Sequence, residues 1–208
     1  MSLKFGALFA VCLWVLIAPS ALLGQTEKAS PPVKKGSHMF VQLTTSLGDI
    51  ILELDHEAAP KTAANFLQYV QEGHYNGTVF HRVIPGFMIQ GGGLDEDLNE
   101  RPTRPPIENE AQNGLIHDHY AVAMARTPDP HSATSQFFID TNKNDFLNFT
   151  STSPASGWGY AVFGRVVKGQ DVVDAIEKTP TSNKSYHQDV PETPVVIEKA
   201  EVLAEYNP

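Results

Sequence analysis

Residues 80–92 read FHRVIPGFMIQGG, two short apolar runs separated by Pro85-Gly86. A proline followed by a glycine is typical of a bend between two strands. Side chains alternate between the two faces of a strand, so Arg82 shares a face with Ile84, and Met88 shares one with Gln90 after the bend. The segment predicts an apolar pocket edged by hydrogen-bond donors, although a surface arginine with a buried stem explains the same pattern.

Short strands of this kind recur on both sides of the segment. Around a turn at 46–49, apolar residues alternate with polar ones (Val41, Leu43, Ile50, Leu52 and Leu54), which predicts a β-hairpin. Further strands are expected at 79–84, 87–90, 120–126, 136–140, 160–167 and 194–203. Amphipathic helices are expected from Pro60 to a stop at Gly73, and at 171–178 behind Gly169. Seven or eight short strands with two helices predict an antiparallel sandwich or a closed barrel.

Aromatic and polar side chains also alternate in a later segment, Ser135-Gln136-Phe137-Phe138-Ile139. As a strand, it places Gln136 and Phe138 on one face, with Phe137 on the other. Either the first face lines a pocket while Phe137 fills the core, or both phenylalanines belong to the core. Two aromatic segments follow, NDFLNF at 144–149 and GWGYAVFGRVV at 157–167.

Taken in order, FHRVIPGFMIQGG, MARTPDPHSATSQFFI, NDFLNF and GWGYAVFGRVV resemble the motifs of cyclophilin-type peptidyl-prolyl cis/trans isomerases, in particular the small bacterial ones. The resemblance covers the predicted domain at 39–206. It implies a mainly β fold, a closed eight-stranded antiparallel β-barrel capped by two α-helices. It further implies that side chains fill the barrel interior and that the substrate, a polypeptide containing an X-Pro bond, occupies an outer groove.

The resemblance also implies roles for individual residues. The expected catalytic residues are Arg82, Phe87 and Gln90, and the expected substrate-binding residues are Met88, Ala125, Gln136, Phe138, Phe146, Leu147 and Tyr160. The chain departs from many eukaryotic members at two positions, because Phe146 stands where they carry tryptophan and Tyr160 where they carry histidine. No cofactor and no metal are expected.

Composition excludes several other classes of function. The 208 residues include 15 Lys and Arg against 24 Asp and Glu, a net charge of −9, so neither a nucleic-acid-binding surface nor attraction to an acidic membrane is expected. The single cysteine, Cys12, excludes an internal disulfide framework and any multi-cysteine metal site.

The first 38 residues differ from the rest. Residues 1–24 combine Lys4, an apolar run at 5–17 and small residues near Gly24, the layout of a signal peptide. Residues 25–38 are polar and are expected to be a disordered linker. Export to the periplasm or the exterior is therefore predicted, as a monomer without stable membrane association after signal removal. The mature chain would lack cysteine and carry a net charge of −10.

Three other interpretations remain to be compared with the structure. His117-Asp118-His119 suggests a metal site, but no third ligand stands at suitable spacing, so a structural or solvated loop is expected. His81 is expected to be a buried structural histidine. The long acidic segment at 94–119 is expected to be functional or mobile.

A groove that binds proline-containing segments without turnover is the main rival function. Arg82 argues against it, because a protein that only binds such segments needs no such donor.

Overall fold

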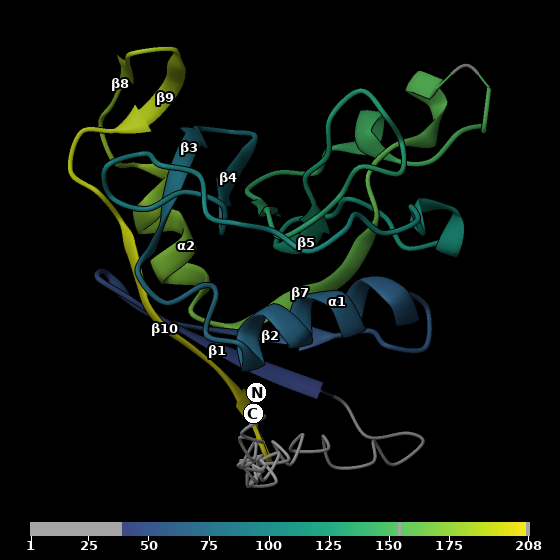
Figure 1. Ribbon diagram of the computed structural model, residues 1–208, viewed down its shortest axis with the longest axis horizontal. Coiled ribbons are helices and arrows are strands. Elements are labelled where there is room, and N and C mark those ends of the chain that lie inside the picture. The colour runs from purple at the N-terminus through teal and green to yellow at the C-terminus, as the bar shows by residue number, and fades with distance from the viewer. Residues whose placement is uncertain (1–38, 154, 207–208) are drawn as a thin grey trace, which may run out of the picture. The chain divides into compact units, whose positions relative to one another are not determined.

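The computed structural model describes residues 39–153 and 155–206, and the predicted signal peptide, the linker and Cys12 lie outside these ranges. Eight strands close into a barrel in the order β1-β10-β3-β4-β6-β5-β7-β2 (Figure 1). Every neighbouring pair is antiparallel. The strands are β1 (Met39–Thr45), β2 (Gly48–Leu54), β3 (Thr78–Ile84), β4 (Met88–Gly91), β5 (Ala121–Met124), β6 (Phe137–Asp140), β7 (Val162–Lys168) and β10 (Val196–Leu203). The closed barrel is thereby confirmed.

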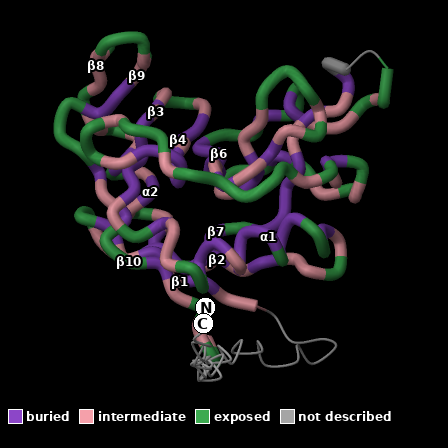
Figure 2. The backbone as a smooth tube through the Cα atoms, viewed as in Figure 1, coloured by how far each residue is buried: buried purple, intermediate pink, exposed green. Residues whose placement is uncertain are grey.

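Two α-helices cover the barrel. Helix α1 (Pro60–Gln71) begins with a proline, whose missing N–H costs nothing at a first helical position, and it packs against β10 and β7. Helix α2 (Gln170–Glu177) packs against β2, β3 and β4. Figure 2 shows that the barrel strands and the inner faces of both helices are buried. The barrel interior is filled by side chains, and the ring of Phe66 lies at centroid distances of 5.4 Å from Phe137 and 5.1 Å from Phe163.

One hairpin was not predicted from the sequence. Strands β8 (Thr181–Lys184) and β9 (His187–Pro191) form a separate two-stranded sheet, which Figure 1 shows beside β3. The hairpin is mostly polar, and two of its residues, Ser185 and Asp189, adopt positive φ angles of 56° without being glycine. It therefore lacks both the apolar alternation and the glycine that make a hairpin recognisable in a sequence.

The acidic segment at 94–119 is packed against the barrel. Both carboxylate oxygens of Glu110 accept backbone N–H groups at the start of α1, from Lys61 at 3.1 Å and Thr62 at 2.8 Å. These N–H groups have no partner within the helix, so Glu110 caps α1 from 48 residues away along the chain. Three short 3-10 helices complete the described chain: η1 (Ala111–Asn113), η2 (Asp145–Leu147) and η3 (Ala155–Trp158). None of the described helices is long and apolar enough to cross a lipid bilayer.

Candidate active site

Strand register builds one functional face on the outside of the barrel. Arg82 pairs with Gln90, and Gln90 pairs with Phe138 on the next strand. Directly paired residues of antiparallel strands point to the same side, so these three side chains stand together. Their neighbours Val83, Ile89 and Ile139 point inward and are fully buried. The predicted alternation at 136–139 is confirmed, because Phe137 lies in the barrel core and Phe138 on the outer face.

A β-bulge directs Arg82 outward. Phe80 pairs with Gly91 and Arg82 with Gln90, so His81 is an extra residue that has no partner in the register. Simple alternation would place Phe80 and Arg82 on the same face, whereas Phe80 lies in the core and Arg82 is half-buried on the outside. A bulge of one residue has this effect of changing which face the following side chains occupy. The sequence gives no indication of it.

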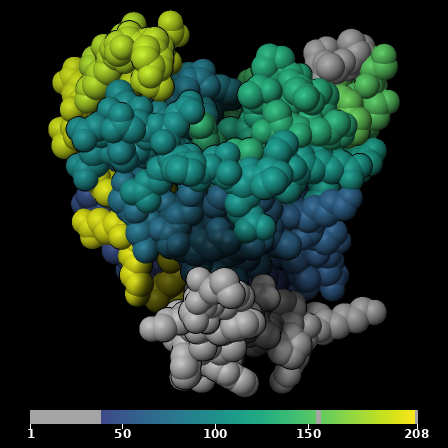
Figure 3. Space-filling view, viewed as in Figure 1, coloured from purple at the N-terminus to yellow at the C-terminus, as the bar shows by residue number. Residues whose placement is uncertain are grey.

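A groove of about 520 Å³ lies over this face. Nine of the ten predicted site residues line it: Arg82, Phe87, Met88, Gln90, Ala125, Gln136, Phe138, Leu147 and Tyr160. Figure 3 shows the surface hollowed between the yellow β8–β9 hairpin and the teal and green segments opposite. Phe146, the tenth residue, does not line the groove; it is 74% exposed and stacks on Phe87 at a centroid distance of 5.6 Å.

A chain of hydrogen bonds holds the polar side of the groove. Nη1 of Arg82 donates to Oε1 of Gln90 at 3.5 Å, and Nε2 of Gln90 donates to Oε1 of Gln136 at 2.9 Å. Gln90 uses both ends of its amide in this chain, whereas Gln136 uses its Oε1, and the side chain of Gln136 also interacts with the ring of His81. Gly93 makes room for Gln136, since a Cβ atom at position 93 would overlap Cγ of that side chain.

The other side of the groove is apolar. Met88, Phe138 and Leu147 are almost fully buried and form one cluster on the outside of the barrel, with Phe87 and Tyr160 packed against it. The ring of Tyr160 meets that of Phe138 edge-on at 5.7 Å. These residues together make a compact apolar recess directly beside the guanidinium of Arg82.

A buried polar network supports the recess from behind. The ring of His117 stacks on Phe138 at 5.7 Å and 6°. Its Nδ1 lies 2.8 Å from the carboxylate of Asp140, and its Nε2 lies 3.1 Å from the carbonyl oxygen of Tyr160. Both ring nitrogens face acceptors, so both contacts are hydrogen bonds only when both nitrogens carry hydrogen. Asn144 donates to the second oxygen of Asp140 at 2.6 Å. The sequence predicted none of these contacts, and the two polar contacts of the His117 ring join residues 23 and 43 positions apart.

The network also shows whether His117 and His119 could bind one metal ion. His117 is turned inward onto Asp140, whereas His119 is exposed and stacks on Tyr120 at 3.9 Å. They do not converge on a common point, and the structural role expected for this loop holds for His117. Among the residues at 39–153 and 155–206, no group of three or more His, Cys, Asp or Glu is placed to hold a metal ion.

His81 is buried, as expected, with 6% of its surface exposed. Burial lowers its pKa from the ordinary 6.5 to about 4, and the nearby positive groups of His187 and Arg82 act in the same direction. Its Nδ1 has no hydrogen-bond partner among the described residues. A neutral ring therefore lies next to the arginine of the groove.

Several groove residues were not predicted. The guanidinium of Arg126 lies 4.6 Å from the centre of the Tyr160 ring, a cation–π contact, and its Nε donates to the carbonyl oxygen of Gly159 at 2.8 Å. The β8–β9 hairpin adds Tyr186, His187 and Gln188 to the opposite wall. Tyr186 is 84% exposed. The unrecognised hairpin explains why these three residues were missed.

Comparison with known proteins agrees with this arrangement. A family model described as "Cyclophilin type peptidyl-prolyl cis-trans isomerase/CLD" matches residues 40–202. Peptidyl-prolyl cis-trans isomerase cyp18 of Streptomyces antibioticus is 62% identical over 163 residues, 78% of this chain and 98% of the relative. Peptidyl-prolyl cis-trans isomerase B of Escherichia coli is 52% identical over 163 residues, 78% and 99% of the two chains. The crystal structure of a cyclophilin type isomerase from Cryptosporidium parvum has a TM-score of 0.66 at 27% identity, covering 83% of this chain and all of that one.

Proposed function

The chain belongs to the cyclophilin-type peptidyl-prolyl cis-trans isomerases, and we propose that Arg82 and the outer groove carry out this isomerisation on X-Pro bonds of unfolded or flexible polypeptides. The observation that carries the proposal is a single juxtaposition. One guanidinium lies beside an apolar recess and donates to the amide of Gln90, which in turn donates to Gln136.

The electronic structure of the X-Pro peptide bond explains why a guanidinium group suits this reaction. Delocalisation of the nitrogen lone pair into the carbonyl group resists rotation with a barrier of about 18–20 kcal/mol. In the twisted transition state this lone pair is localised on the prolyl nitrogen. A donor aimed at that nitrogen stabilises the twisted amide more than the planar one, which is the condition for catalysis. The reaction needs no nucleophile, proton transfer or metal.

The remaining residues have supporting roles in this proposal. Phe87, Met88, Phe138 and Leu147 hold the proline ring by apolar contact, because the ring has no donor and fits an apolar recess. Gln90 orients Arg82, and the amide of Gln136 holds a substrate carbonyl group. One side of the X-Pro bond is thus fixed while the other side rotates.

Substitution of Arg82 tests this assignment. Arg82→Lys keeps the charge but removes the planar fork of donors, so kcat/KM should fall about 10- to 100-fold. The assay is two-dimensional exchange NMR on a short Ala-Pro peptide with catalytic amounts of enzyme. Arg104→Lys is the matched control, because Arg104 is exposed and its ion pair with Glu72 lies outside the groove. An unchanged rate in Arg82→Lys would show that Arg82 has been given the wrong role.

The cellular setting is part of the proposal. The signal-like layout of residues 1–24 supports export to the periplasm or the exterior as a monomer that assists folding there. Sequencing the N-terminus of the mature protein from a cell extract tests this, since export with cleavage removes about the first 24 residues. An intact Met1 in a cytosolic fraction would contradict it.

A further inference from the structure

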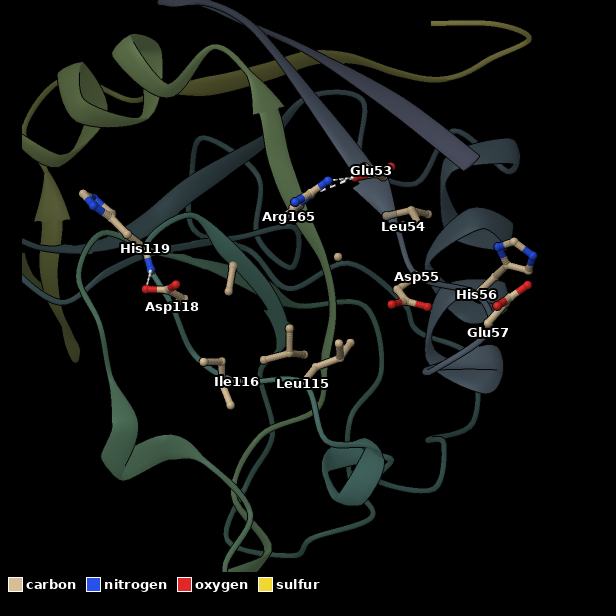
Figure 4. Close-up of a pocket in the computed structure, with 13 residues that line it drawn as sticks. Glu53, Leu54, Asp55, His56, Glu57, Leu115, Ile116, Asp118, His119 and Arg165 are labelled. Carbon is tan, nitrogen blue, oxygen red and sulfur yellow. Dashed lines mark hydrogen bonds and ion pairs between the residues drawn. The ribbon is translucent and has the colours of Figure 1, made fainter. Parts of the chain in front are cut away.

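A second hollow of about 630 Å³ lies on the outside of the barrel, away from Arg82. We call it the β2–β7 hollow, since strands β2 and β7 contribute Glu53, Leu54, Val162 and Arg165 to it. Figure 4 shows that Asp55, His56 and Glu57 stand on one side, and that Asp118 and His119 stand on the other. Leu115 and Ile116 lie between the two sides.

The charges of this hollow are unbalanced. Four carboxylates and a single guanidinium line it. The guanidinium belongs to Arg165, which already pairs with Glu53 through Nε at 2.8 Å and Nη2 at 2.7 Å. Asp55, Glu57 and Asp118 form no ion pair with another described residue. Two facing sides therefore present carboxylates without an ion-pair partner among the described residues, although Asp55 accepts the backbone N–H of Ala58 and Asp118 that of His119.

The base of the hollow is apolar. Leu115, Ala121 and Val162 line it, and Ile116 beside them is 50% exposed although it is a large aliphatic side chain. Removing such surface from water favours binding. An apolar base between acidic sides matches a ligand that carries both aliphatic groups and cations.

One apolar cluster lies beneath both the hollow and the catalytic groove. Ala121, Val162 and Leu115 belong to the same outer cluster as Met88 and Phe138, which line the groove. The groove is centred on β4 and β6, and β7 is two strands away from β6 in the barrel. Two strand spacings amount to about 10 Å. One extended polypeptide can therefore contact both places.

We propose that the β2–β7 hollow is a second binding site for the polypeptide substrate, which takes a segment with Lys or Arg next to aliphatic side chains. The proposal rests on the proposed function, since the segment belongs to the same polypeptide whose X-Pro bond occupies the groove. An extended chain covers about 3.3 Å per residue and must pass around Leu147 and Tyr160, so the segment lies roughly four to eight residues from the proline.

Direct binding of a proline-free peptide tests the hollow independently of catalysis. The probe is acetyl-Lys-Leu-Lys-Leu-Ala-Gly-amide, and its acidic counterpart with Glu in place of Lys is the control. In titrations of the isotope-labelled protein at low salt, the basic peptide should shift the amide signals of Ile116, Ala121 and Val162. Raising the salt from about 20 to 200 mM should weaken binding several-fold, because screening acts on exposed charges.

Paired substitutions then test the charges. Glu57→Gln with Asp118→Asn removes two carboxylates without removing the side-chain acceptor that the backbone of His119 uses. About fivefold weaker binding is expected, from two exposed ion pairs of ordinary strength. Glu192→Gln with Glu198→Gln is the matched control, which removes the same charge from exposed positions outside the hollow. Ile116→Ser should also weaken binding, and its exposure makes unfolding an improbable cause.

Four results would overturn the proposal: equal binding of the acidic peptide, equal loss in the two double variants, shifts confined to the groove signals of Gln90 and Phe138, or binding of spermidine as tight as that of the peptide. The last would assign the hollow to small polycations instead of polypeptides. None of them bears on isomerisation, which the exchange assay on Ala-Pro peptides measures separately, so failure of this proposal is distinguishable from failure of the proposed function.

Discussion

Acidification from pH 7 to pH 5 should destabilise the folded domain through His81. This histidine is buried beside Arg82, and its burial lowers its pKa to about 4, whereas in the unfolded chain it has the ordinary 6.5. Between these two values the unfolded chain binds a proton that the folded chain does not. The free energy of unfolding therefore falls as the pH falls through this window, and it is fully restored above 6.5.

The size of the effect follows from the two pKa values. A difference of one pKa unit corresponds to about 1.36 kcal/mol, so complete acidification through both values removes about 3 kcal/mol. Between pH 7 and pH 5 the expected share is about 2 kcal/mol. This is a large fraction of the 5–15 kcal/mol that domains of this size typically possess.

The measurement is urea unfolding at several pH values between 7 and 5, for the wild type and for His81→Gln. Glutamine is neutral throughout, so this variant should lose about 2 kcal/mol less than the wild type over the range. His74, whose pKa burial also lowers, is present in both proteins and cancels in the comparison. His119→Gln, at an exposed position, controls for the loss of an imidazole as such. Equal losses in the wild type and His81→Gln would refute the reasoning from burial.

Three further predictions concern the site. His117→Ala leaves the carboxylate of Asp140 buried without its imidazole partner, so the free energy of unfolding, measured in urea, should fall by about 3–5 kcal/mol. A loss under about 1 kcal/mol would contradict a stabilising contact between these two buried side chains. Gly93→Ala pushes Gln136 out of place, so kcat/KM on Ala-Pro peptides should fall about tenfold while circular dichroism stays unchanged; a wild-type rate would show that Gln136 adapts. Phe146→Ala removes an exposed stacking partner of Phe87, so stability should change by less than about 1 kcal/mol while KM rises; an unchanged KM would place Phe146 outside the binding surface.

The barrel could be predicted from the sequence in part because strands such as β1 have one buried and one partly exposed face, whereas β5 and β6 are buried at every residue. Alternation at 41–45 and 50–54 specifies both the strand type and its inner residues, and the helix from Pro60 has an apolar stripe with a clear start. Closure of the barrel came from the resemblance, since alternation alone fits a sandwich equally well. The β8–β9 hairpin was missed because its residues are polar and only partly buried, so no periodicity marks them.

Part of the candidate site could also be predicted from the sequence. Local motifs supplied Arg82, Met88, Gln90 and Phe138, because register brings neighbouring strands together in a regular way. The contacts that set their geometry were not predictable. The bulge at His81 depends on how β3 pairs with β4, and the contact of His117 with Asp140 depends on how a long connection folds over the barrel. Neither has a signature in the order of residues.

The segment at 94–119 contributes residues to both outer sites, the β2–β7 hollow and the groove beside Arg82. Within four consecutive residues, Leu115 and Ile116 line the β2–β7 hollow, His117 stacks behind Phe138 of the groove, and Asp118 returns to the hollow. The buried contact of His117 Nδ1 with the carboxylate of Asp140 fixes the position of this segment. A substitution at Asp140 would therefore disturb both sites at once, whereas Glu57→Gln on the opposite side of the hollow leaves the segment at 115–118 intact. Among the charge-removing variants of the hollow, Glu57→Gln is thus the one whose effect on peptide binding is separable from any effect on the apolar recess of the groove.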